Sequence, residues 1–179
     1  MDNKKQRAVI TGIGAMTPLG EKVEEFWSSL VAGRSGITKI SLADTSDFPS
    51  DIAGEVTTFD PINYFDKREA RRMARFSQLA VAAATMAISD AQLNIDQLDR
   101  NRLGVIMGNG NGGFPTTEEN ARLLISNGGM RMSPHFIPMI LPNMAAANVS
   151  RIFGLKGYTS TIITACAAGT QAIGEAAEV

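Results

Sequence analysis

Short apolar runs that end in glycine alternate with amphipathic stretches along this chain. Residues 7–14 and 103–107 each have the pattern of a buried strand that leads into a glycine turn. A third run, rich in β-branched residues, covers residues 159–164. Apolar residues at helical spacing separate these runs. Strands that alternate with helices predict an α/β fold with a largely parallel sheet.

The helices expected between the runs differ in how clearly the sequence marks them. The clearest covers about residues 67–91, where Asp66 can cap the first turn and Glu69 completes a capping box. The Ser-, Asp-, Gly- and Pro-rich segment 34–60 predicts loops with one or two short strands, around residues 52–56. The remaining helices are expected over residues 21–32 (with Gly33 as a left-handed cap), 116–126, 138–152 and from Cys166 onwards.

The composition is that of a globular protein without a strong electrostatic preference. The chain has 179 residues, 44% hydrophobic and 20% charged, and its net charge is −1. That charge gives no global field for nucleic acid or a membrane surface. The longest apolar stretch, residues 79–88, is too short to span a bilayer. No linker or repeat interrupts the chain, so residues 1–179 are predicted to form one domain.

The only cysteine, Cys166, lies where the third apolar run meets a predicted helix. The positive end of a helix dipole favours a thiolate, and the first backbone N–H groups of the helix could bind an oxyanion. Small residues after it leave room for a substrate carbonyl. A lone cysteine is otherwise often a small buried hydrophobe, and spacing alone leaves both interpretations open. A single free thiol indicates a reducing compartment, and we expect a cytoplasmic protein.

His135 is the only imidazole in the sequence and lies in a loop bracketed by two prolines. A surface or interface histidine is the simpler interpretation. If His135 were the base for Cys166, the chain would be a compact cysteine hydrolase. No cluster of cysteine and histidine offers a zinc site, and we expect neither a metal nor an organic cofactor.

Two glycine-rich turns resemble nucleotide-binding loops. Residues 12–14 carry Gly-Ile-Gly, but Thr17 stands where the dinucleotide fingerprint requires a third glycine. Residues 108–113 match the fingerprint by pattern, but no acidic residue follows about 20 positions later. Tight turns between packed elements are therefore favoured over a phosphate site.

Arginines recur at positions 68, 71, 72 and 75, which would share one face of the long predicted helix. Such a face can simply be solvated. Because the rest of the chain has no comparable cluster, it can also be a docking patch for an acidic partner.

Taken together, these motifs resemble β-ketoacyl-[acyl carrier protein] synthases of type II, which are thiolase-like condensing enzymes. The match runs in order along essentially the whole chain, which makes it specific. The resemblance is carried by the segments RAVITGIGAMTPLG (7–20), FW (26–27), GRSGI (33–37), RRMARF (71–76), GNGNGG (108–113), SPHFIP (133–138), NMAA (143–146) and TACAAG (164–169).

The resemblance implies the N-terminal half of a layered αβαβα fold that forms homodimers, with the chain stopping soon after the nucleophile. It implies that Cys166 accepts an acyl group from an acyl carrier protein. Malonyl-carrier protein then loses carbon dioxide, and the resulting carbanion attacks the acyl-enzyme to extend a fatty acid by two carbons. The family's two catalytic histidines and its lysine belong to the later half, so the chain alone is expected to be inactive.

The resemblance also implies roles for individual residues. Arg68, Arg71 and Arg72 match the family's docking patch for the acidic carrier protein, and Arg131 is placed with them. Asn111 stands where the family often has an apolar residue of the acyl pocket. Phe136 matches a residue that reaches the neighbouring subunit's pocket, and His135 falls on an aromatic position of the same loop.

Three other functions stay open at this point. A polyketide-type ketosynthase would use the same chemistry on another substrate, and Asn111 is the only hint of it. A non-catalytic binding or assembly partner is a second possibility, although such a subunit would usually lack the nucleophile. The cysteine hydrolase is the third, and it requires His135 to be essential.

Overall fold

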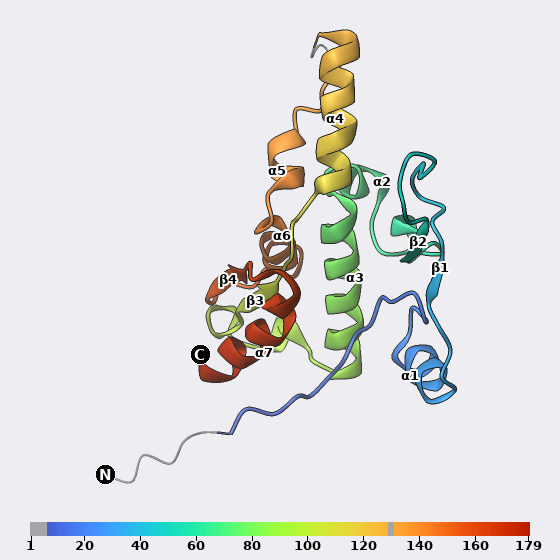
Figure 1. Ribbon diagram of the computed structural model, residues 1–179. Helices are drawn as coiled ribbons and strands as arrows, with labels where there is room; N and C mark the ends of the chain where they lie inside the picture. The colour runs from blue at the N-terminus through green and yellow to red at the C-terminus, as the bar shows by residue number, and fades with distance from the viewer. Residues whose placement is uncertain (1–6, 129–130) are drawn as a thin grey trace. The chain divides into compact units, whose positions relative to one another are not determined.

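The computed structural model describes residues 7–128 and 131–179 (Figure 1). Their contacts divide them into two compact units. Unit 1 comprises residues 7–10, 65–81 and the described residues from 94 to 179, and unit 2 comprises residues 11–64 and 82–93. The expectation of a single domain over residues 1–179 remains a prediction.

A pair of parallel strands forms the centre of unit 1. Strand β3 (Val105–Gly108) pairs with β4 (Thr159–Ile162), with Val105 opposite Thr159 and Gly108 opposite Ile162. Both strands were predicted from the sequence, and both are confirmed with slightly shifted bounds. Because the strands are parallel, the segments that follow Gly108 and Ile162 leave from the same end of the pair.

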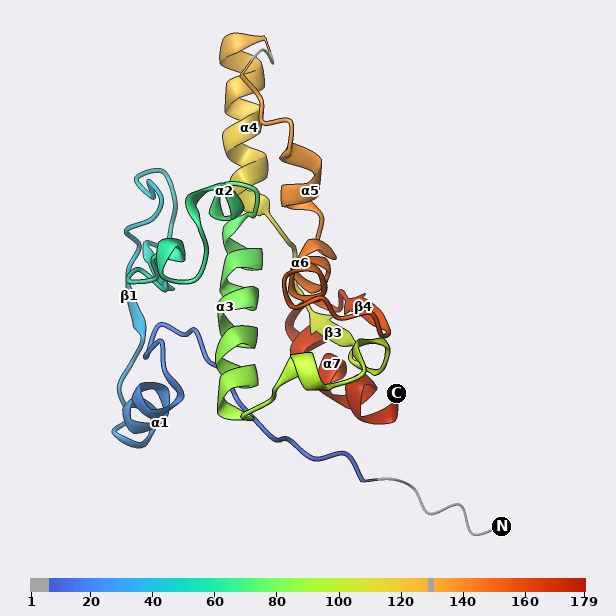
Figure 2. The same cartoon turned by 180° about the vertical axis from the view of Figure 1, so that it is seen from behind.

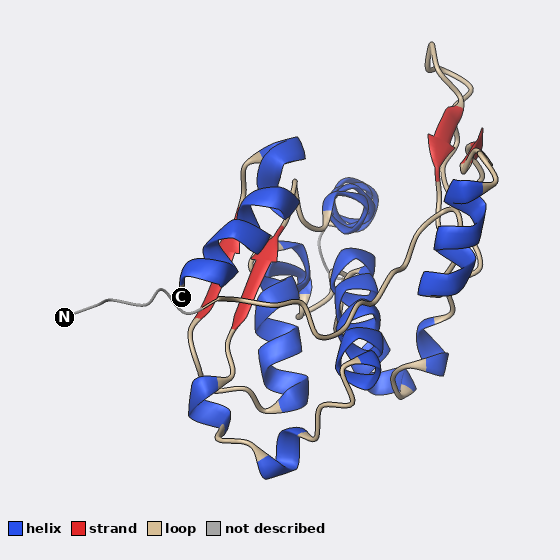
Figure 3. Cartoon of the chain, turned by 90° about the horizontal axis from the view of Figure 1, so that it is seen from below, coloured by secondary structure: helices blue, strands red, loops and turns tan. Residues whose placement is uncertain are grey.

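Two helices contact both strands: α6 (Met144–Phe153) and α7 (Ala168–Glu178) (Figure 3). Views from opposite sides show both helices next to the strand pair (Figures 1 and 2). Small and β-branched side chains fill the space between strands and helices. The buried residues here are Val105, Ala145, Ala146, Val149, Ile162, Ala168 and Ala172.

The close approach of α7 to β3 depends on Gly108. A Cβ atom at this position would lie 2.3 Å from the carbonyl oxygen of Ala168 and 2.6 Å from the nitrogen of Gly169. Only a residue without a side chain fits there. Gly108 therefore sets how closely the first turn of α7 can lie to the sheet.

The long helix predicted over residues 67–91 is wrong in one respect, because it is two helices. Helix α2 (Lys67–Ala70) ends before Arg71, and α3 runs over Arg75–Asp90. The predicted cap is present, since Asp66 Oδ1 accepts from the N–H groups of Arg68 and Glu69 at 2.8 and 2.9 Å. The Gln78 side chain donates to the carbonyls of Ala70 (2.8 Å) and Met73 (3.2 Å), which stabilises the break.

The helix predicted over residues 138–152 is also divided. Helix α5 (Phe136–Ile140) stops at Leu141, whose ψ of 129° is extended because Pro142 follows it. Helix α6 begins at Met144, two residues after that proline, and ends at Gly154 in the left-handed conformation. The remaining helix of this region, α4 (Phe114–Asn127), starts two residues earlier than predicted and ends at Gly128, also left-handed. Short 3₁₀ turns, η2 (Ile95–Gln97) and η3 (Arg100–Arg102), precede β3.

Unit 2 contains helix α1 (Val23–Val31), the antiparallel strands β1 (Ile37–Lys39) and β2 (Ile52–Gly54), and the 3₁₀ turn η1 (Pro61–Asn63). The predicted left-handed residue after α1 is confirmed at Gly33, with φ of 65°. In this unit the segment after residue 10 lies against the second half of α3. A Cβ atom on Gly14 would stand 1.9 Å from the Ala83 carbonyl oxygen.

The strand predicted over residues 7–14 does not form. Val9 and Ile10 are 71% and 76% exposed, and no neighbouring strand in the described part of the chain offers them a hydrogen-bond ladder. The apolar run at these residues was therefore not sufficient to form a strand. None of the helices in the described residues has the length and apolar character needed to cross a membrane.

Candidate functional site

Cys166 lies in a short link between β4 and α7 and is exposed. The link is a single 3₁₀ turn, η4 (Ala165–Ala167), closed by the Ala167 N–H to the Thr164 carbonyl at 3.1 Å. Buried Ile162 and Ala168 hold the link at either side. The predicted strand-to-helix junction at the thiol is therefore confirmed.

The residue before the cysteine has a strained backbone. Ala165 has φ of 51°, a left-handed conformation that an L-residue with a side chain rarely adopts. Strain of this kind persists only where the surrounding structure imposes it. Here the Thr164 hydroxyl donates to Gln171 Oε1 at 3.0 Å, and the Gln171 amide donates to Glu175 at 2.8 Å. These bonds tie the strained turn to the exposed side of α7.

The glycine turn at residues 108–113 leaves β3 at the same end of the strand pair as the Cys166 link. Asn109 holds it: its backbone N–H donates to Ile162 O (2.9 Å) and its amide donates to Pro142 O (2.8 Å). Its side-chain oxygen accepts from the Gly112 N–H at 3.2 Å. Asn111, at the exposed tip of this turn, therefore belongs to the same end of the sheet as the thiol.

Phe136 is half-buried at the first position of α5, and His135 is the exposed residue before it. The His135 backbone N–H donates to Ser133 Oγ at 3.1 Å. Within residues 7–128 and 131–179, no hydrogen bond or ion pair joins the imidazole to Cys166. The geometry gives the cysteine hydrolase no support.

The predicted arginine patch lies on α2 and the turn after it, rather than on one helix face. Arg68 and Arg71 are exposed, and Arg72 is half-buried. The N–H of Glu69, followed by that of Arg68, lowers the pKa of Asp66 below its ordinary value, and the charges of Arg68 and Arg72 act in the same direction. The cap of α2 is thus an ionised carboxylate at neutral pH. Arg131 is exposed in the turn that precedes α5.

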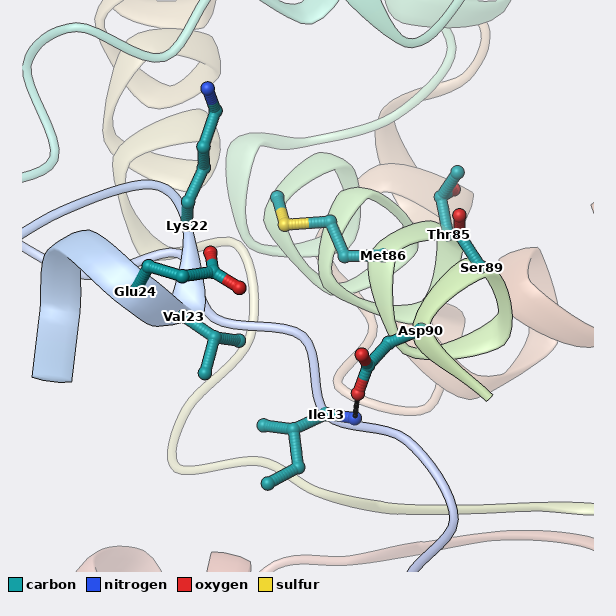
Figure 4. A pocket seen from close by; sticks show the side chains of 8 residues that line it. All are labelled: Ile13, Lys22, Val23, Glu24, Thr85, Met86, Ser89 and Asp90. Atoms are coloured by element: carbon teal, nitrogen blue, oxygen red, sulfur yellow. Dashed lines mark hydrogen bonds between the residues drawn. The ribbon is translucent and has the colours of Figure 1, made fainter. Parts of the chain in front are cut away.

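The first glycine pair lies beside an open pocket in unit 2, lined by residues of α1 and α3 (Figure 4). The Ile13 N–H, which a bound phosphate would need, donates instead to Asp90 Oδ2 at 2.8 Å. Gly12 and Gly14 permit close contact with the α3 backbone, where added Cβ atoms would stand 2.3 and 1.9 Å from carbonyl oxygens. Packing explains both glycines without a nucleotide.

Three residues that shape the site were not found from the sequence: Ala165, Gln171 and Asn109. The left-handed Ala165 carries no sequence signal, because alanine favours helical and extended conformations and does not mark a positive φ. Gln171 acts through contacts with Thr164 and Glu175 across one helix start, and Asn109 acts through contacts with the distant Pro142 and Ile162. An asparagine between glycines does favour turns, and that is the only signal that could have indicated Asn109.

Curated relatives match nearly the whole chain. The "3-oxoacyl-[acyl-carrier-protein] synthase 2" of Staphylococcus aureus is 43% identical over 177 residues, which cover 99% of this chain and 43% of the relative. The protein of the same name from Synechocystis sp. is 42% identical over 97% of this chain and 42% of its own length. The chain thus spans less than half the length of these relatives.

Solved structures share its fold. The ishigamide ketosynthase/chain length factor superposes with a TM-score of 0.85 and 33% identity over 93% of this chain and 42% of the other. A β-ketoacyl synthase from Burkholderia phymatum superposes with a TM-score of 0.82 and 29% identity, over 97% of this chain and 43% of the other. The third structure is a type II polyketide ketosynthase in complex with its acyl carrier protein and bound to the hexaketide. It superposes with a TM-score of 0.79 and 28% identity, over 97% of this chain and 46% of the other.

These likenesses agree with the fold expected from the motifs. The neighbours are thiolase-like ketosynthases, and the mixed α/β arrangement described above corresponds to the N-terminal half of that fold. The family model described as "Beta-ketoacyl synthase, N-terminal domain" matches residues 5–179. With the sequence motifs, the fold and the cysteine junction in agreement, the chain belongs to the β-ketoacyl synthase family.

Proposed function

We propose that the protein is a 3-oxoacyl-[acyl carrier protein] synthase of type II and that Cys166 is its acyl-accepting nucleophile. The observation that carries this proposal is the exposed thiol at a strained strand-to-helix junction. It occurs in a chain 43% identical to synthases of that name. Exposure lets an acyl thioester reach the sulfur, and the start of α7 supplies backbone N–H groups for a developing oxyanion.

The proposed reaction passes through one covalent intermediate, the acyl thioester of Cys166. The Cys166 thiolate attacks the thioester carbonyl of an acyl carrier protein, and the phosphopantetheine thiol leaves. Malonyl-carrier protein then loses carbon dioxide to give a carbanion. The carbanion attacks the acyl-enzyme and expels the Cys166 thiolate, giving a 3-oxoacyl product two carbons longer. Separating transfer from condensation replaces one difficult step with easier ones.

The chain of 179 residues is expected to show no condensing activity by itself. The resemblance assigns decarboxylation to two histidines and a lysine of the later half, and His135 is the only histidine present. The measurement is release of carbon dioxide from malonyl-carrier protein together with formation of the 3-oxoacyl product. Turnover above that of a Cys166→Ala control would overturn this expectation.

Arg68, Arg71 and Arg72, with Arg131, are proposed to dock the acyl carrier protein. The support is the exposure of Arg68, Arg71 and Arg131, the place of the first three arginines on or directly after the capped helix α2, and the carrier protein bound in one ketosynthase neighbour. Acidic partners are attracted by such a patch, and salt screens that attraction.

Reversing the charge of Arg68, Arg71 and Arg72 to glutamate is therefore expected to weaken carrier-protein binding by at least about tenfold at low salt. The difference should shrink as ionic strength rises. Titration calorimetry at two salt concentrations measures both effects. A loss that does not change with salt would point to misfolding, and no loss would refute docking at this patch.

A polyketide-type ketosynthase is the second candidate, favoured by one solved neighbour from a type II polyketide system and by the polar Asn111 in the proposed acyl pocket. Phe136 is proposed to line the same pocket in the neighbouring subunit. Acylation of Cys166 by saturated acyl-carrier proteins of different lengths, compared with poly-β-keto analogues, separates the two. A strong preference for the keto analogues would favour the polyketide function.

We also infer a homodimer and a cytoplasmic location for the whole protein. Strand β4 pairs only with β3 among the described residues, so one of its edges is available to another strand. A free thiol is kept reduced most readily in the cytosol, which is the support for the cytoplasmic location. Sedimentation analysis of the whole protein tests the dimer, and a monomer at micromolar concentration would contradict it.

A further inference from the structure

The carboxylate of Glu69 lies within the proposed docking segment, between two arginines. Glu69 is in α2, directly after Arg68, and its side chain is only 26% exposed. Its Oε2 accepts a 2.6 Å hydrogen bond from Nη2 of Arg151, 82 residues later in α6. Its Oε1 stands 4.0 Å from Nη1 of Arg72. The same negative charge therefore faces two cations at very different distances.

The contact to Arg151 is the strong one. At 2.6 Å it is a charge-assisted hydrogen bond, whereas the 4.0 Å approach of Arg72 is beyond hydrogen-bond distance. The same Nη2 also donates to Oδ1 of Asn148 at 3.2 Å. Because Asn148 is buried, this second bond fixes the guanidinium at the surface of α6. Arg151 is thereby held in position to neutralise Glu69.

We infer that Arg151 is a positioning residue: by occupying Glu69 it keeps Arg72 available to an acidic carrier protein. Arg72 is three residues after Glu69, close enough to pair with it. If Arg151 were absent, Glu69 would attract Arg72 into an internal ion pair, and a docking partner would have to break that pair. This inference rests on the proposed docking of a carrier protein at α2.

In a simpler role, the Glu69–Arg151 pair only holds α2 in place. Under the simpler role, losing either partner damages the segment equally. If Arg151 instead keeps Arg72 available, losing Arg151 weakens docking. Losing the charge of Glu69 does not weaken docking, since an uncharged Glu69 position no longer attracts Arg72. The two partners of one ion pair are thus expected to give different results: weaker docking when Arg151 is lost, and unchanged or tighter docking when the charge of Glu69 is lost.

The test is binding of a holo acyl carrier protein to the 179-residue chain at low salt, measured for Arg151→Met, Glu69→Gln and the double variant. We expect Arg151→Met to raise Kd about threefold, on the scale of one exposed ion pair. We expect Glu69→Gln to leave Kd unchanged or lower, and the double variant to match Glu69→Gln. Arg122→Met is the matched control, because it breaks the 2.7 Å ion pair with Glu118 on α4, outside the docking segment.

Each other outcome overturns the inference. Weaker binding by Glu69→Gln shows that the pair merely supports α2, and a double variant as weak as Arg151→Met shows that Arg151 itself contacts the carrier. Thermal melting will show whether Arg151→Met folds. If it does not fold, Glu69→Gln remains the test, because any loss of carrier-protein affinity in that variant contradicts the inference. Charge reversal at Arg68, Arg71 and Arg72 separates the two proposals: if it weakens binding while Arg151→Met does not, only this inference fails.

Discussion

Replacing Cys166 by alanine is expected to eliminate transfer of an acyl group from acyl carrier protein to this chain. The Cys166 side chain is the only thiol in the sequence, and it is exposed in the turn directly before α7. No other side chain can form the thioester, so acyl transfer to Cys166→Ala should fall to the level measured with that variant after denaturation. The measurement is the mass of the protein after incubation with an acyl-carrier protein, compared before and after hydroxylamine treatment, which cleaves thioesters.

Thr170→Ala is a suitable control for that experiment. Thr170 is exposed in the first turn of α7, so its loss changes the surroundings of the thiol without removing it. This variant should be acylated like the unaltered chain. Acylation that persists in Cys166→Ala would assign the nucleophile to another residue and remove the basis of the proposed function.

The second large effect is expected from Gly108→Ala, which adds one methyl group between β3 and α7. Its Cβ would lie 2.3 Å from the Ala168 carbonyl oxygen and 2.4 Å from the Ala168 carbonyl carbon. Those are backbone atoms, so no side chain can rotate away, and the helix or the strand must move. We expect a loss of about 3 kcal/mol in the free energy of unfolding, at the upper end of overpacking. Urea denaturation measures it.

Gly174→Ala is the matched control because it adds the same methyl group to the same helix. Nothing lies within 4 Å of a Cβ atom at Gly174. Alanine is the better residue within a helix, so this variant should gain about 0.5–1 kcal/mol. Opposite signs for the two glycines would establish close packing at Gly108. Equal effects would show that the clash at Gly108 relaxes and that α7 is not held tightly to the sheet.

The sequence predicted the parallel strands and the cysteine junction because both are local patterns. A β-branched run followed by small residues describes 159–169 without reference to distant segments, and the structure agrees. The break between α2 and α3 was not predictable in this way. It depends on Gln78, which donates to carbonyls at Ala70 and Met73, whereas propensity alone favours a continuous helix there.

Two other features lay outside the reach of sequence patterns. The apolar run at residues 7–10 has the composition of a strand, but a strand forms only where a partner strand is present. At the site, Cys166 was identifiable as a lone thiol in a specific motif. The strained Ala165 and its tether through Thr164 and Gln171 became visible only in three dimensions, because they depend on φ angles and on side-chain geometry.

The central claim is that Cys166 receives acyl groups from a docked carrier protein rather than reacting as any exposed thiol. The chain offers a convenient readout, because Lys156 is its last basic residue and trypsin therefore releases residues 157–179 as one peptide that contains Cys166. The most direct measurement is the rate at which that peptide gains an acyl group from a carrier-linked donor and from the same acyl group on free pantetheine. We predict faster transfer from the carrier-linked donor at low salt, with the advantage shrinking as salt rises. Equal rates from both donors at every salt concentration would contradict the account.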